Sequence, residues 1–249
     1  MRPLVAALRF LTVLPIPGSW GSAEDDLARS AAWFPVVGLL LGAVAAGFAM
    51  VLPMVAPPLV CAGTMVVVLM GFSGGMHLDG LSDAADGLLS SRPRERILEI
   101  MKDSHIGAMG VMAIVGTLLL KFAALASPSA GELWATALVM PLAGRCAIVV
   151  QLALLPYARA SGLAGIFYRR RNRLTSLWAA ALLAAVACGV LGWRGLAVGA
   201  ASVGVAIVFS AYVYRKIGGA TGDTLGAVCE IVELVPALVL VLGPMGQAR

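Results

Sequence analysis

The sequence predicts an all-α protein, a polytopic integral membrane bundle of about seven transmembrane helices. Of its 249 residues, 60% are hydrophobic and 12% are charged, whereas a soluble domain carries about a quarter charged residues. The hydrophobic residues fall in runs of a length that matches the hydrocarbon core of a bilayer. Lysines and arginines gather in alternate loops between these runs, as membrane topology requires.

Seven apolar segments, separated by prolines and glycines, are expected to span the membrane. They cover residues 34–53, 58–78, 106–126, 132–156, 176–192, 195–214 and 225–244. Before them, residues 1–17 are expected to form an interfacial segment, because Leu4–Leu14 is followed at once by Pro15 and Pro17. We treat residues 1–249 as a single transmembrane domain, in which residues 79–105 form a cytoplasmic loop and helix of the active site.

The orientation follows from the basic residues. Most of them, from Arg2 and Arg9 to Arg215 and Lys216, fall in the loops of one side, and the opposite loops hold Arg194 and Arg249. By the positive-inside rule that side is cytoplasmic, and an odd number of spans places the C-terminus outside. This distribution also accounts for the net charge of +5. Aromatic residues do not interleave with the basic ones, so we expect no nucleic-acid partner.

The most informative segment is 74–87, which contains Asp79, Asp83 and Asp86. In a helix, this spacing places the three carboxylates within about 60° of one another. Like charges on one face at a membrane edge are costly, so a cation is expected to hold them together. Oxygen ligands favour Mg²⁺ or Mn²⁺ over zinc. The alternative is a solvated helix face, which the surrounding apolar residues and glycines disfavour.

A second acidic segment lies far along the chain, where Asp223, Glu230 and Glu233 follow Thr221. In a helix, these acids share a broad face at the cytoplasmic end of the last span. Glu230 and Glu233 fall within an apolar run, where an unpaired carboxylate is expensive. Two readings stay open: metal ligands, or buried structural acids paired with Lys or Arg.

Several other polar residues stand near these acids or within spans. Lys102 is suited to neutralising a phosphate, Asp103 could join the metal ligands, and the glycines that follow allow close backbone approach. Arg145 lies within a span and needs either an acidic partner or a substrate phosphate. Lys121 is expected to extend toward the outer interface. His77 points away from the acidic face if the helix begins that early, so a structural role stays open beside a functional one.

These segments together resemble the cobalamin synthase (adenosylcobinamide-GDP ribazoletransferase) family. The matching pieces occur in order at residues 34–42, 77–87, 94–110, 157–159 and 218–233. The resemblance implies a Mg²⁺-dependent membrane transferase. A hydroxyl of α-ribazole, or of its phosphate, attacks adenosylcobinamide-GDP, GMP leaves, and adenosylcobalamin or its phosphate forms.

We predict three sets of site residues, of which the catalytic and magnesium-binding sets overlap. The catalytic set is Asp79, Asp83, Asp86 and Asp103. The magnesium-binding set is Asp79, Asp83, Asp86, Asp223 and Glu230. The substrate-binding set is His77, Lys102, Arg145, Arg159 and Thr221.

The resemblance also implies partners and a location. The expected partners are adenosylcobinamide-GDP, α-ribazole or its phosphate, membrane lipid and other enzymes of the corrinoid pathway. The expected location is the bacterial inner (cytoplasmic) membrane, with an active site that faces the cytoplasm.

Two other functions are weighed against this one. Residues 83–87 look like half of the CDP-alcohol phosphotransferase motif, but Ser90 and Ser91 stand where that family has Ala-Arg, and its later aspartates are absent. A cation- or proton-coupled transporter would also contain intramembrane acids. Transporters usually place those acids near the midplane of related halves, and neither feature is evident here.

Overall fold

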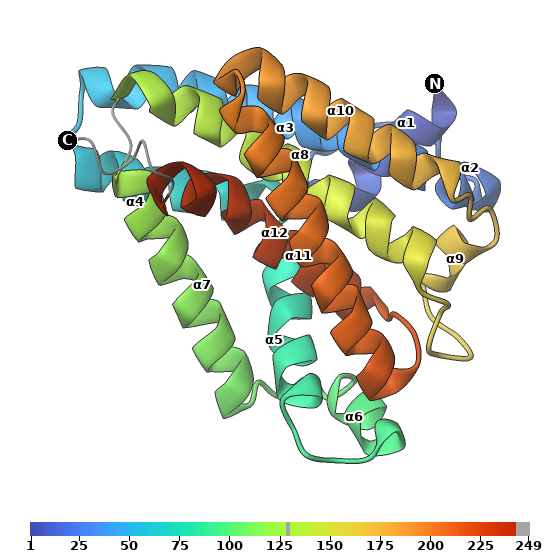
Figure 1. The fold of residues 1–249 in the computed structure, drawn as a ribbon. Helices are drawn as coiled ribbons and strands as arrows, with labels where there is room; N and C mark the ends of the chain where they lie inside the picture. The colour runs from blue at the N-terminus through green and yellow to red at the C-terminus, as the bar shows by residue number, and fades with distance from the viewer. Residues whose placement is uncertain (128–129, 243–249) are drawn as a thin grey trace.

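The computed structural model describes residues 1–127 and 130–242, and its architecture is all-α, as predicted (Figure 1). Six of the described helices are long and apolar enough to cross a membrane, and a bent helix pair brings the number to seven. The last two residues of the predicted final span, and the C-terminus that we expect outside, lie beyond the described residues.

The seven predicted spans correspond to seven helices. These are α3 (Phe34–Val51), α4 (Pro58–Phe72), α7 (Ala108–Ala126), α8 (Ala130–Leu154), α10 (Leu174–Leu191), α11 (Arg194–Ile217) and α12 (Gly222–Leu242). The shorter elements are α1 (Arg2–Leu11), α2 (Glu24–Ala28), η1 (Ser30–Trp33), η2 (Leu52–Met54), α5 (Met76–Leu88), α6 (Arg94–Ile100) and α9 (Gly165–Tyr168).

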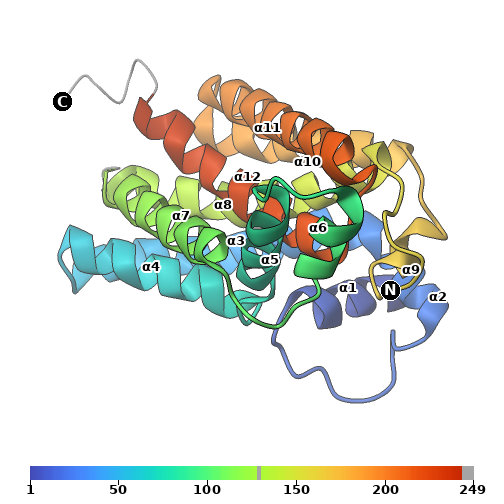
Figure 2. The same ribbon diagram turned by 90° about the horizontal axis from the view of Figure 1, so that it is seen from below.

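The second predicted span, 58–78, is too long by six residues. Helix α4 ends at Phe72, and α5 leaves it at an angle of 88°. Gly74 and Gly75 turn the chain here with φ values of 60° and 80°, a region that glycine adopts without steric cost. The acidic segment therefore forms a separate helix that turns away from the direction of α4, and in Figure 2 it lies in front of α12.

Helices α8 and α12 form the centre of the bundle and are the most buried of the candidate spans. Helix α8 packs closely on α3, since a Cβ atom at Gly38 would lie 2.7 Å from the Pro141 carbonyl oxygen. Helix α12 packs on α8 and on α5. Small residues allow such close approach where lipid gives no hydrophobic drive between helices. The central helix α12 therefore carries the acidic helix α5 on its flank.

The basic loops meet at one end of the bundle, as the predicted orientation requires. Arg94 Nε donates to the Ile217 carbonyl at 2.8 Å, and its Nη2 donates to the Ala158 carbonyl at 2.9 Å. Arg170 pairs with Asp25 at 3.1 Å. These contacts join the start of α6 to the end of α11 and to the loop after α8, and the loop after α9 to α2.

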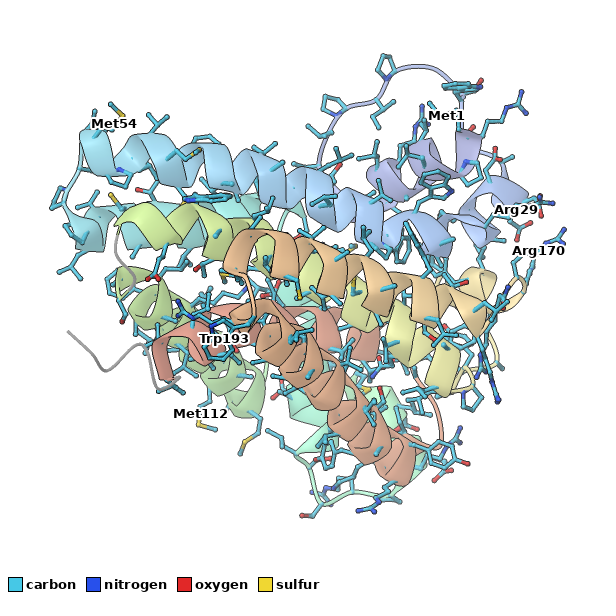
Figure 3. All side chains as sticks on the ribbon, turned by 45° about the horizontal axis from the view of Figure 1, so that its top comes forward. Met1, Arg29, Met54, Met112, Arg170 and Trp193 are labelled. Atoms are coloured by element: carbon cyan, nitrogen blue, oxygen red, sulfur yellow. The ribbon has the colours of Figure 1, made fainter. Side chains whose placement is uncertain are left out.

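The opposite end of the bundle has its own contact. Arg194 pairs with Glu132 at 3.0 Å and donates to the Leu240 carbonyl at 3.2 Å. Figure 3 shows Arg29 and Arg170 at one end of the molecule and Met54 at the other. The loops therefore divide between two ends, in agreement with seven crossings.

Candidate active site

Four aspartates come together where α5 meets the start of α12, and we refer to Asp79, Asp83, Asp86 and Asp223 as the aspartate group. Glycines set the distance between these helices. A Cβ atom at Gly80 would lie 3.0 Å from the Asp223 backbone oxygen, and one at Gly226 would lie 3.2 Å from the His77 carbonyl oxygen. A side chain at either position would push α5 away from α12, so the glycines bring Asp223 to the α5 carboxylates.

Two members of the aspartate group have no partner within the described residues. Asp79 is exposed, Asp83 is half-buried, and neither makes a hydrogen bond or ion pair in this part of the chain. Asp83 experiences the negative charges of Asp79, Asp223 and Asp86, with Arg159 as the opposing positive charge. The charges of Asp79, Asp86 and Asp223 thus act on Asp83, and the protein balances them only in part.

Asp86 has a different role, because its carboxylate binds the start of α7. The Gly107 N–H donates to one oxygen at 2.7 Å and the Gly110 N–H donates to the other at 2.9 Å. These are two of the amide groups that the first turn of a helix leaves without intrahelical partners. A Cβ atom at either glycine would collide with this carboxylate. The close backbone approach expected of these glycines is therefore used to hold Asp86.

Asp223 is oriented by two neighbours. Arg159 Nη2 donates to Asp223 Oδ2 at 2.8 Å, and the Thr221 hydroxyl donates to the same oxygen at 3.1 Å. Thr221 is fully buried at the N-cap of α12, where its hydroxyl also accepts from the Thr224 N–H at 3.3 Å. Arg159 further contacts the Met101 carbonyl at 3.4 Å. Thr221 thus positions Asp223, while Arg159 links Asp223 to the loop after α6.

The loop after α6 carries Lys102 and Asp103. Lys102 is exposed and follows Met101, the residue that Arg159 contacts. Asp103 Oδ1 lies 2.6 Å from His105 Nδ1, which lowers the pKa of Asp103 and raises that of His105. Asp103 is therefore bonded within its own exposed loop, while Lys102 remains available to a phosphate.

A separate set of charges lies inside the bundle, and we call Lys121, Arg145, Glu230 and Glu233 the buried ion network. Lys121 Nζ donates to Glu230 at 2.7 Å and to Glu233 at 2.8 Å, and Arg145 pairs with the other oxygen of Glu233. All four side chains are buried. Two positive and two negative charges balance, as burial requires.

This network changes three expectations. The expectation that Lys121 extends to the outer interface is wrong, because two carboxylates hold it inside. Glu230 lies with Lys121 and apart from the aspartate group, so its position gives no support to a role as a metal ligand. Arg145 has an acidic partner, the structural alternative that the sequence left open, and its burial separates it from substrate.

An apolar pocket of about 210 Å³ adjoins the aspartate group. Its walls include Phe10, Phe34, Leu163, Phe167, Asp79 and Asp223. His77 also belongs to its lining and is 3% exposed. Neither ring nitrogen of His77 has a hydrogen-bond partner among the described residues.

Sequence reasoning missed the walls of this pocket. Phe10 comes from the expected interfacial segment, and Phe167 comes from the stretch between the fourth and fifth predicted spans. Both rings pack with Phe34, at 6.0 Å and 5.3 Å between centroids. Three single phenylalanines, far apart in sequence, give no local pattern that predicts a pocket.

Comparisons with known proteins agree on one family. The family model described as cobalamin-5-phosphate synthase matches residues 3–241. An adenosylcobinamide-GDP ribazoletransferase of Roseiflexus sp. (strain RS-1) is 41% identical, over 96% of this chain and 89% of its own length. A second protein of that name, from Desulfitobacterium hafniense (strain Y51), is 39% identical over 94% of each chain. No solved structure matches the chain significantly.

Proposed function

The chain belongs to the cobalamin-5-phosphate synthase family and is an adenosylcobinamide-GDP ribazoletransferase, and we propose that the transfer takes place at the aspartate group. The observation that carries this location is the lack of any partner for Asp79 and Asp83 among the described residues. Acids that serve only packing would be paired, as Glu230 and Glu233 are. The family match over residues 3–241 favours this activity over the two alternatives, a lipid head-group transferase and a transporter.

The donor chemistry of the aspartate group suits Mg²⁺. No three His, Cys, Asp or Glu side chains in residues 1–127 and 130–242 converge as a complete metal site. Magnesium, however, is commonly bound by one or two carboxylates, with waters and substrate phosphates as its other ligands. Asp79 and Asp83, one turn apart on α5, would hold it. Such an ion would neutralise negative charge on the diphosphate.

The reaction exchanges one phosphorus–oxygen bond for another. A ribazole hydroxyl attacks the phosphate nearer cobinamide, its oxygen bonds to that phosphorus, and the bridging bond to the second phosphate breaks to release GMP. The hydroxyl proton passes to a carboxylate. Asp86 accepts hydrogen bonds from backbone N–H groups, and Asp223 accepts one from Arg159. Asp79 and Asp83 therefore remain as acceptors of the hydroxyl proton. Arg159 and Lys102 supply positive charge for the departing phosphate.

The direct test is an assay of the purified protein with adenosylcobinamide-GDP and α-ribazole, in which GMP release is measured with and without EDTA. We expect release that requires both substrates, stops with EDTA and returns with excess Mg²⁺. Undiminished release in EDTA, after removal of bound metal, would exclude the magnesium proposal while leaving the transferase activity intact.

We also propose that the site faces the cytoplasm, since the loops that surround it carry most of the basic residues. Cysteines introduced at Ser91 and Ser161 should react with a membrane-impermeant thiol reagent only when it reaches the cytoplasmic face. Labelling of either position from the periplasm in intact cells would contradict this orientation.

A further inference from the structure

We propose that the apolar pocket beside the aspartate group, lined by Phe10, Phe34, Leu163, Phe167 and His77, binds the aromatic base of the ribazole substrate. This inference rests on the proposed function, because it assigns one part of a substrate to one part of the site.

The three phenylalanines make the pocket suitable for a flat aromatic ring. Phe10 lies 4.9 Å from Phe167 at an interplanar angle of 63°, and Phe34 lies 5.3 Å from Phe167 at 76°. Phe10 is half-buried, whereas Phe34 and Phe167 are buried. Edge-to-face and stacked arrangements are those that aromatic rings favour. A base that enters the pocket can therefore contact Phe10 while the two buried rings hold the wall in place.

His77 supplies a polar group that the folded chain leaves unused. His77 is 3% exposed and belongs to the pocket lining, and neither ring nitrogen has a hydrogen-bond partner in the described part of the chain. Buried polar groups normally have partners. A ring nitrogen of a bound base can accept a hydrogen bond from this imidazole, which would satisfy one of its nitrogens.

The chemistry of the walls distinguishes between the aromatic groups of the two substrates. Guanine carries several hydrogen-bond donors along its edge, which a wall of phenylalanine and leucine would leave unpaired. The ribazole base has one free acceptor nitrogen and no donor. A volume of about 210 Å³ also excludes the corrin macrocycle. The pocket thus matches the base of α-ribazole better than it matches the guanine or the corrin ring of adenosylcobinamide-GDP.

The position of the pocket fits this assignment. Asp79 and Asp223 form part of its lining, together with the phenylalanines. A nucleoside whose base occupies the apolar part therefore places its ribose beside the carboxylates that we expect to receive the hydroxyl proton.

A protection experiment tests occupancy without turnover. Leu163 is exposed and lines the pocket, whereas Leu174 is similarly exposed and does not. Each position is changed to cysteine in a Cys188→Ala background, because Cys188 is the one native cysteine that is not buried. Each variant protein is then treated with a thiol reagent. We expect α-ribazole to slow labelling of Leu163→Cys and not of Leu174→Cys, and GMP to slow neither. Protection by GMP alone, or no protection by saturating α-ribazole, would overturn the assignment.

Kinetics provide the second arm. We expect Phe10→Leu to raise the KM for α-ribazole about tenfold, the loss of roughly one base–aromatic contact, with the KM for adenosylcobinamide-GDP unchanged. His77→Leu should act in the same direction, and His77→Gln should restore part of the loss. Equal changes in both KM values would refute the pocket assignment. A wild-type protein that binds α-ribazole but releases no GMP would instead refute the proposed function.

Discussion

The aspartate group and the buried ion network are both rich in carboxylates, yet they differ in how far basic side chains balance the negative charge. In the network, Lys121 Nζ lies 2.7 Å from Glu230, and Arg145 pairs with Glu233. In the aspartate group, Asp223 pairs with Arg159, and the other three carboxylates form no ion pair within the described residues. The network has no net charge, whereas the aspartate group carries a net negative charge.

This difference indicates which acids serve the fold and which serve chemistry. A buried carboxylate must be balanced by charges within the protein, because neither lipid nor water compensates it. A carboxylate at the end of the bundle can instead leave its charge for a cation or substrate. Pairing, more than the presence of acids in apolar segments, separates the two roles in this chain.

The substitution Asp83→Asn tests most directly whether the aspartate group serves chemistry. If the aspartate group is the site of transfer, this nearly isosteric change should reduce the rate of GMP release about 10²–10⁴-fold, the usual contribution of a group that handles a proton. Thermal stability should be unchanged or slightly raised, because like-charge repulsion falls. The matched control is Asp26→Asn on α2, which belongs neither to the aspartate group nor to the pocket lining and should retain full activity. Normal turnover by Asp83→Asn at saturating Mg²⁺ would refute its role.

A second large effect is expected within the buried ion network. Lys121→Met leaves Glu230 and Glu233 short of one cation, and breaking a buried pair costs about 3–5 kcal/mol of unfolding free energy. Thermal unfolding in detergent should record this loss. The double variant Lys121→Met with Glu230→Gln removes one charge of each sign and should recover much of the stability. Equal stability of the single variant and wild type would show that the network contributes little to the fold.

A smaller effect tests the contact between α5 and α12. Gly80→Ala adds a Cβ atom against the Asp223 backbone, so we expect about 1–3 kcal/mol of destabilisation from overpacking. Displacement of the α5 carboxylates should also lower the rate of GMP release about 10-fold to 100-fold. Gly116→Ala on α7 is the control, since nothing lies within 4 Å of the added atom. Identical activity of both variants would mean that the spacing of the two helices is not critical.

The smallest effect concerns Asp103, an exposed acid that belongs to neither group. Its hydrogen bond raises the pKa of His105 and lowers its own. The charged pair therefore persists between the two pKa values and is lost as pH rises past that of His105 or falls past that of Asp103. Asp103→Asn should shift the His105 titration to lower pH. The chain has only two histidines, so NMR of ring-labelled protein can follow His105 directly, with His77→Gln to assign it.

The sequence predicted the spans well, because runs of apolar residues are a local property. It also placed Asp79, Asp83 and Asp86 on one helical face, since their spacing alone determines that. It did not predict the partner of Lys121, which lies 109 residues away on α12 and depends on how α7 packs. The sequence did not predict the bend at Gly74 and Gly75, because the apolar run continues past these glycines to Leu78.

The clasp between Asp86 and the first turn of α7 also has a practical consequence for handling the protein. Its two hydrogen bonds hold together the two ends of the segment from Gly87 to Ile106. The positions of the α5 carboxylates therefore do not depend on the length of this segment. Each doubling of a flexible loop costs only about 0.6 kcal/mol. A short epitope or fluorophore sequence inserted between Ser91 and Arg92 should therefore be accommodated, which offers a position for a reporter close to the reaction.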